Sequence, residues 1–303
     1  MSRRRARRAV LGRRDPVHLA ALRDQLVAAR LAGHVQTSRQ DTLTKCARLI
    51  AGDDTVTFGL SDWRDATFSE VVAAVTALCG GDLHAAGNKR PGQNRPAAGD
   101  LHSGQELPAA GDLHAAGGDP DRDDAPGWID PEATLAGVAR HRERLAGVAA
   151  AGGARVLVAT GHPAGLLPHY QAVARSLQSS GSQLLTPAEG RPLPGGEGGR
   201  RELRYLEGVA CVSDGASLRH THRAGYMQAA LAEVGPGVEL VVADHGFAGA
   251  AIEQGIPTLS IADLNDVALP LAQARGRTDG VLPIDDNLAP RLFVQVTAAM
   301  LEW

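Results

Sequence analysis

Cysteine, aromatic residues and long apolar runs are all scarce in this sequence of 303 residues. The three cysteines, Cys46, Cys79 and Cys211, stand far apart and form no C-x-x-C pair. Their spacing excludes a disulfide scaffold and a thiolate zinc finger and favours a reducing compartment. Aromatic residues make up 3% of the chain, too few for a platform that stacks single-stranded nucleic acid. No apolar stretch is long enough to cross a bilayer. We therefore expect a cytoplasmic protein with no membrane or nucleic-acid partner.

Lysine is also scarce: Lys45 and Lys89 are the only lysines among 31 basic residues. Seven of the arginines fall within residues 1–14, which contain no acidic residue, and the rest of the chain has more acidic than basic residues. Such an arm can contact an acidic partner, but it is more typical of a disordered tail. We interpret residues 1–14 as a disordered basic arm.

Residues 80–127 contain Gly-Asp-Leu-His three times, starting at Gly81, Gly99 and Gly111, among many glycines and prolines. With hardly any large apolar side chain, this segment cannot bury enough surface to offset its ordering entropy. The three histidines suggest a metal site, but the unevenly spaced copies favour a duplicated loop. We predict a disordered insertion.

Regular elements are expected on both sides of this insertion. Residues 15–79 show capped starts and apolar residues at helical spacing, which predict a helical module. From residue 128 to 303, short apolar strands alternate with helices. The predicted strands are 155–159, 183–185, 202–206, 209–212, 239–243, 258–261 and 280–284, with helices at 165–177, 223–233, 247–254, 267–274 and 289–301 and a loop at 187–200. This alternation predicts a Rossmann-like α/β domain with an open, mostly parallel sheet flanked by helices.

Ligands of such sheets bind beyond the carboxyl ends of the strands. The strand at 155–159 is followed by T-G-H-P-A-G at 160–165. Small residues allow a close approach of the backbone, and the N-terminus of the following helix can bind an anion. The segment is neither a Walker A motif nor G-x-G-x-x-G. We predict that Thr160, Gly161 and Gly165 bind phosphate and that His162 is catalytic; alternatively, the glycines only shape a turn.

Histidines mark the next strand end. His220 and His222 are two residues apart and share one side of an extended chain, and imidazole suits zinc, iron or manganese. Arg223 can bind a phosphate, and Asp214 follows the strand at 209–212. We predict His220 and His222 as metal ligands, His222 also as a catalytic residue, Arg223 as a phosphate-binding residue and Asp214 as a secondary site residue. The alternative is a polar loop with two exposed histidines.

Aspartates follow the remaining strands. Asp244 and His245 come after the strand at 239–243 and open a helix. We predict both as catalytic and Asp244 also as a metal ligand, the alternative for Asp244 being a helix cap. Asp263 and Asp285 follow the last two strands, and we take them as secondary site residues, although capping is the stronger interpretation there.

Several segments of residues 130–303 carry a resemblance. These are A-T-G-H-P-A-G-L-L-P-H-Y at 159–170, H-T-H at 220–222, A-D-H-G-F-A-G-A-A-I at 243–252, I-A-D-L-N-D at 261–266 and I-D-D-N at 284–287. In them the chain resembles a family of actinobacterial proteins labelled phosphatase, and A-D-H-G is the most specific part. The resemblance implies phosphoester hydrolysis. The signatures D-x-D-x-T/V, C-x5-R and R-H-G are all missing, and the insertion departs from the family.

Taken together, these features predict a phosphatase-like hydrolase that acts on a small phosphorylated metabolite with the help of a divalent metal ion. Two alternatives stay open: an enzyme of the sugar-phosphate isomerase type, and a non-catalytic protein that binds a nucleotide or phosphometabolite. The sequence also leaves open whether the chain forms a homo-oligomer.

Overall fold

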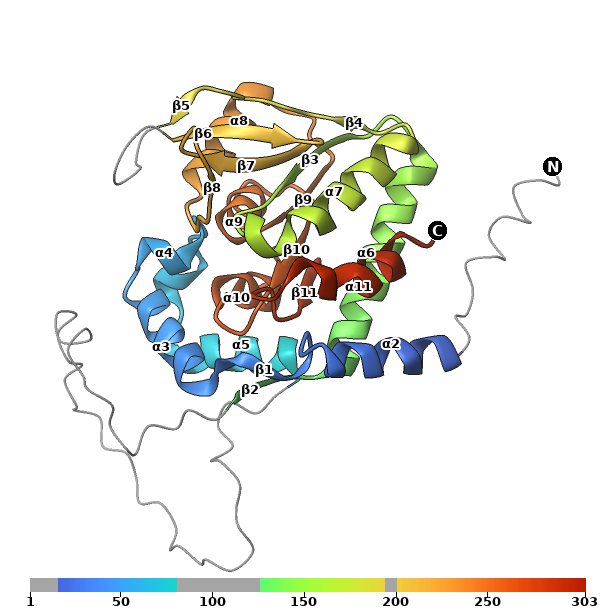
Figure 1. Ribbon diagram of the computed structural model, residues 1–303. Helices are drawn as coiled ribbons and strands as arrows, with labels where there is room; N and C mark the ends of the chain where they lie inside the picture. The colour runs from blue at the N-terminus through green and yellow to red at the C-terminus, as the bar shows by residue number, and fades with distance from the viewer. Residues whose placement is uncertain (1–15, 81–125, 194–200) are drawn as a thin grey trace, which may run out of the picture.

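The computed structural model describes residues 16–80, 126–193 and 201–303 (Figure 1). The predicted arm and nearly all of the predicted insertion lie outside these residues. The first part contains α2 (Pro16–Ala28), β1 (Gly33–Ser38), α3 (Arg39–Ile50), α4 (Asp54–Thr57), the 3-10 turn η1 (Asp62–Asp65) and α5 (Phe68–Cys79). The side chains of Ser38 and Thr67 cap α3 and α5, as the sequence predicted.

Residues 33–38, to which we assigned no element, form a strand. β1 pairs antiparallel with β2 (Pro126–Ile129), whose first two residues fall within the predicted insertion at 80–127, so the insertion was predicted two residues too long at this end. The buried apolar residues from Leu22 to Cys79 belong to the same hydrophobic core as those of the sheet. The structure therefore does not set residues 15–79 apart as a separate helical module.

The rest of the chain alternates strands and helices. Its elements are α6 (Pro131–Ala151), β3 (Arg155–Ala159), α7 (Pro163–Ser179), β4 (Gln183–Leu184), β5 (Pro192–Leu193), β6 (Arg201–Leu206), β7 (Val209–Ser213), β8 (Leu218–Arg219), α8 (Gly225–Val234), β9 (Leu240–Asp244), α9 (His245–Glu253), β10 (Thr258–Ala262), α10 (Ala268–Ala274), β11 (Val281–Pro283), the 3-10 turn η3 (Pro290–Phe293) and α11 (Val294–Leu301). Two predictions were wrong in detail: β5 lies inside the expected loop at 187–200, and the helix expected at 289–301 begins as a 3-10 turn.

The main sheet has the strand order β11-β10-β9-β3-β7-β6-β5, with β4 beside β3 and β8 beside β7. The strands from β11 to β7 run parallel, and β5, β6 and β8 are antiparallel to their neighbours. The predicted α/β class with an open, mostly parallel sheet is confirmed. The chain moves outward from β3 to β7 and then returns to β9, so the order reverses between β3 and β9. This is where ligands bind in such sheets.

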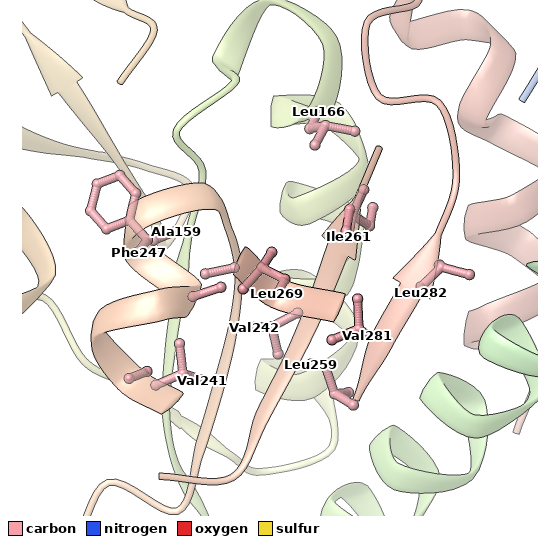
Figure 2. Packing of buried hydrophobic residues seen from close by; sticks show 14 of the residues in the cluster. Ala159, Leu166, Val241, Val242, Phe247, Leu259, Ile261, Leu269, Val281 and Leu282 are labelled. Atoms are coloured by element: carbon pink, nitrogen blue, oxygen red, sulfur yellow. The ribbon is translucent and has the colours of Figure 1, made fainter. Parts of the chain in front are cut away.

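Helices cover the sheet and bury its strands. All residues of β7, β9, β10 and β11 are buried, as expected for parallel strands with both faces covered. Helices α6, α7 and α11 contact one another, and a second group consists of α8, α9, α10 and α5. Figure 2 shows Leu166 of α7 and Leu269 of α10 beside apolar side chains of β9 and β10. Among the described residues, no helix is long and apolar enough to cross a membrane.

Candidate functional site

Asp244, the last residue of β9, ties together the two strand ends at the reversal. Its carboxylate is fully buried and accepts hydrogen bonds from the Thr160 hydroxyl at 2.6 Å and from the Gly161 N–H. Burial raises the pKa of Asp244, while His245 and these hydrogen bonds oppose the rise. The carboxylate thus fixes the loop after β3 against the start of α9.

Glycine at two positions allows the loops to meet. A Cβ on Gly161 would collide with the carbonyl oxygen of Thr221 and lie 3.2 Å from Asp244 Oδ1. A Cβ on Gly246 would collide with the backbone of His222 and Arg223. The N–H of Thr221 also donates to the carbonyl of Gly161 at 2.9 Å. Three loops that are far apart in sequence therefore meet at one place.

Four histidines gather where these loops meet. The ring of His220 stacks on those of His162 and His245, with centroid distances of 4.6 and 5.2 Å. His222 lies 4.6 Å from His245 and 4.8 Å from His220. His162 and His245 are buried and His220 is exposed, so His220 forms the open side of the group. His245 adopts a left-handed φ of 44°, a strained conformation that is common at functional sites.

The imidazole of His245 lies among three carboxylates. Its Nδ1 is 3.6 Å from Asp244 Oδ1, and its Nε2 is 3.5 Å from Asp266 Oδ1 and 3.3 Å from Asp286 Oδ2. Burial alone would lower the pKa of His245, but Asp266, Asp286 and Asp244 together raise it to about 10. Nδ1 of His162 lies 3.5 Å from the same Asp286 oxygen. The three carboxylates therefore favour a positive charge on this ring, which a proton supplies at neutral pH.

The pKa values of the other groups follow from burial and from this charge distribution. Partial burial and the charge of His245 together lower the pKa of His220 to about 4 and that of His222 to about 3. Burial raises the pKa of Asp266 to about 7 against the opposing effect of His245. The pKa of Asp286 is held well below its usual range by His162 and His245, despite its burial. At neutral pH, the imidazoles of His220 and His222 are therefore uncharged.

The carboxylates of Asp263 and Asp285 hold β1 at the edge of the sheet. Asp263 accepts a hydrogen bond from the Thr37 hydroxyl, and Asp285 accepts one from the N–H of Gln36 at 3.0 Å. Both residues are buried. The two residues therefore position the N-terminal segment over the strand ends, beside the group of histidines.

The side chains of Asp214 and Arg223 have surroundings that differ from those of the four histidines. The Asp214 carboxylate accepts from the N–H groups of Ala216 and Ser217 and pairs with arginines, which lowers its pKa to about 2. Arg223 is exposed and lines a depression of about 260 Å³ whose lining includes Asp54 and Gln228 and none of the four histidines.

The turn that we predicted to bind phosphate already uses most of its N–H groups. The N–H of Thr160 donates to the Ala210 carbonyl, that of Gly161 to Asp244, and that of His162 to the Thr160 hydroxyl. The N–H of Gly165 reaches the His162 carbonyl at 3.3 Å. Binding of a phosphate by this turn would therefore have to replace protein hydrogen bonds.

Two groups of side chains have the spacing of metal ligands. One ligand atom each from His162, His220 and His245 lie within 4.8 Å of one another, and so do those from His245, Asp266 and Asp286. His245 belongs to both groups. His222 adjoins the first group, because its Nε2 lies 2.9 Å from His220 Nε2. Asp244, which we predicted as a ligand, lies on the other side of His245, with its carboxylate bonded to Thr160 and Gly161.

Sequence reasoning missed Asp266 and Asp286 as site residues. Each lies close to Asp263 or Asp285 in sequence, and we interpreted these clusters as helix caps. One feature of the sequence could have identified them: both clusters follow parallel strands, whose carboxyl ends share one edge of the sheet.

The fold and the site together define a Rossmann-like α/β protein with a site of histidines and aspartates at the switch point of its sheet. A protein family described as Phosphatase matches residues 17–95 and 113–303. The chain belongs to this family, which confirms the resemblance and extends it to the N-terminal segment. The match is interrupted at 96–112, inside the predicted insertion. Phosphatase SCO2771 of Streptomyces coelicolor is 34% identical over 290 residues, covering 93% of this chain and 94% of that protein.

Proposed function

We propose that this protein is a metal-assisted hydrolase of small phosphate monoesters. Membership of the phosphatase family supports the reaction type. The proposal of a metal rests on one observation: His162 Nδ1 and Asp286 Oδ2 are buried atoms without a hydrogen-bond partner, and both residues lie beside His245, whose Nε2 is 3.3 Å from the Asp286 oxygen. Buried polar atoms are nearly always satisfied, so this grouping is best explained by a cation that they bind.

The distances between these atoms support coordination. His245 Nε2 lies 3.3 and 3.5 Å from the oxygens of Asp286 and Asp266, and His162 Nδ1 lies 3.5 Å from Asp286. Two ligands that are each about 2.1 Å from a tetrahedral ion are roughly 3.4 Å apart. We therefore assign His162, His245, Asp266 and Asp286 as ligands, with His220 on the open side. The mixture of nitrogen and oxygen donors suits zinc, manganese or iron better than magnesium or calcium.

His222 is prepared for the same role by its backbone contact. Its Nδ1 lies 2.8 Å from the carbonyl oxygen of Thr55. Because a carbonyl oxygen can only accept, Nδ1 carries the proton and Nε2 is left with its lone pair, facing His220. Ligating histidines typically have such a second contact, which fixes their tautomer. His222 is thus a further ligand on the open side of the site.

In phosphate ester hydrolysis, the residues of the site would have different roles. A bound metal ion would polarise the phosphoryl oxygen and supply a water of lowered pKa. Asp244 positions the loop after β3 and the ring of His245. Phe58, fully buried, packs against the rings of His222 and His245 at 5.4 and 5.5 Å and excludes water from that side. The exposed His220 marks the side from which the substrate enters.

The proposal is tested by metal analysis and phosphate release on protein purified without a histidine tag. We expect a divalent transition metal to copurify, and a chelator to abolish phosphate release from small phosphate monoesters until metal is restored. Asp286→Asn should lose metal and activity. Asp279→Asn is the matched control, because Asp279 is exposed and pairs only with Arg144 among the described residues.

Two results would contradict the proposal. Full phosphatase activity in metal-free protein would exclude metal assistance. A metal-loaded protein that releases no phosphate from any small phosphate monoester would instead favour the isomerase-type enzyme or the binding protein.

A further inference from the structure

The Asp286 carboxylate lies between two imidazole rings. Its Oδ2 atom is 3.3 Å from His245 Nε2 and 3.5 Å from His162 Nδ1. Within the described part of the chain, this buried oxygen has no hydrogen-bond partner, and neither has His162 Nδ1. The centroids of the two rings are 5.9 Å apart. One carboxylate oxygen therefore faces two separate histidines and bonds to neither.

On the inner side of Asp286, the surroundings are buried and partly acidic. Asp266 Oδ1 lies 3.5 Å from His245 Nε2, and the side chains of His245, Asp266 and Asp286 are all buried. One ligand atom from each of these three residues lies within 4.8 Å of the other two. This inner group offers one nitrogen and two oxygens to an ion.

On the outer side of Asp286, the ligand atoms are nitrogens. The ring of His162 stacks on that of the exposed His220 at 4.6 Å, and Nε2 of His222 lies 2.9 Å from Nε2 of His220. Two nitrogens that each lie about 2.05 Å from one ion at a right angle are roughly 2.9 Å apart. The spacing of His220 and His222 therefore suits two ligands of one ion with five or more ligands.

Together these side chains are more than one catalytic ion can use. A catalytic zinc ion typically has three protein ligands and keeps its fourth position for water or substrate. An octahedral ion with six protein ligands would have no position left for a substrate. The site offers six side chains: His162, His220, His222, His245, Asp266 and Asp286.

A shared Asp286 oxygen sets a suitable distance between two ions. Carboxylate oxygens lie about 2.1 Å from such ions, so one bridging oxygen holds two of them at most about 4.2 Å apart. This limit includes the separation of about 3.5–4 Å at which paired ions in phosphatases bind the attacking and the leaving oxygens of a phosphoryl group.

We propose that the site binds two metal ions that share the Asp286 carboxylate. This inference rests on the proposed function and extends it from one ion to a pair. The outer ion faces the open side of the site, and the inner ion lies among buried ligands. The inner ion is bound by His245 and Asp266, and the outer ion by His162, His220 and His222.

The first test counts ions in the full wild-type chain, purified without a histidine tag and stripped of metal by a chelator. Titration with Mn²⁺ should saturate at two ions per chain, measured by elemental analysis. Electron paramagnetic resonance of the Mn²⁺ protein should show the exchange coupling of two ions that share a ligand. A chelator should remove the ions in two phases, because the outer ion is on the side of the exposed His220.

Two variants separate the ions. Asp266→Asn should lose the inner ion and His220→Ala the outer ion, so each should keep one ion per chain and show no exchange coupling. His34→Ala is the matched control, because His34 is exposed and packs on the ring of Trp128; it should keep both ions. Melting temperatures show whether each variant folds, and the wild-type titration does not depend on them.

Saturation of the wild type at one ion per chain, or two ions without exchange coupling, would overturn the proposal. Folded Asp266→Asn and His220→Ala that both bind no metal would also overturn it, since one common ion explains that result. The proposed function fails in a different way. Two coupled ions in a protein that releases no phosphate from any small monoester would support the pair of ions and refute the hydrolase.

Discussion

Replacing Asp244 by asparagine tests how the two strand ends are held together. The carboxylate accepts from Thr160 and Gly161 in full burial. Asparagine can accept from the Gly161 N–H with its oxygen and donate to the Thr160 hydroxyl with its amide. Both hydrogen bonds then survive but lose their charge.

The expected magnitudes differ between two substitutions. A hydrogen bond to a charged group contributes about 1.5–3 kcal/mol and a neutral one about 0.5–1.5 kcal/mol, so Asp244→Asn should lower the free energy of unfolding by about 2 kcal/mol. Asp244→Ala leaves both buried donors unsatisfied, at about 1–3 kcal/mol each, and should cost about 4 kcal/mol. Urea unfolding at pH 7 measures both values.

Metal retention provides the second measurement. Asp244 is one of three carboxylates around His245, so Asp244→Asn should weaken metal binding while leaving the protein folded. The reasoning is refuted if Asp244→Asn and Asp244→Ala destabilise equally, since the difference between them comes only from the retained hydrogen bonds. It is also refuted if Asp244→Ala is as stable as the wild type.

Two further predictions concern stability. His141 and His169 are fully buried, and burial lowers their pKa values to about 4 and about 3. Near and below pH 6.5, the unfolded chain therefore binds more protons at these two residues than the folded chain does. Each histidine should lower the free energy of unfolding by about 2 kcal/mol at pH 5 relative to pH 7. Urea unfolding at both pH values checks this, and the loss should shrink in His169→Phe; an unchanged loss would contradict it. A Cβ on Gly249 would collide with the carbonyl oxygen of Phe58, so Gly249→Ala should lower stability by about 1–3 kcal/mol. At Gly147 no atom lies within 4 Å of a new Cβ, so Gly147→Ala should raise the free energy of unfolding by about 0.5–1 kcal/mol. Similar melting temperatures for the two variants would show that the contact with Phe58 does not destabilise Gly249→Ala.

The strand at 155–159 could be predicted to the residue, because five consecutive residues of a buried parallel strand leave a clear apolar run. β1 could not be predicted, since G-H-V-Q-T-S is largely polar and its partner β2 starts about 90 residues later, at the end of the predicted insertion. Its formation depends on pairing and on the acidic residues Asp263 and Asp285, and neither contact leaves a local pattern.

The candidate site was partly predictable for a similar reason. His162, His220, His222, Asp244 and His245 all follow strands, and the common edge of a parallel sheet brings such positions together. Their assigned roles stay predictions. Asp266 and Asp286 were hidden because an aspartate after a strand looks the same whether it caps a helix or faces a ligand.

The bonds of Asp263 and Asp285 to β1 have a consequence for synthesis of the protein. β1 is made early, whereas Asp263 and Asp285 are made near the end of the chain. Because translation adds only about 5–20 residues per second, the first part must wait for the carboxylates that anchor it. A nascent chain that has not yet exposed residue 286 lacks the Asp286 carboxylate beside His245 and the Asp285 anchor for β1. Ribosome-bound intermediates should therefore hold neither β1 nor the ring of His245 as the finished protein does.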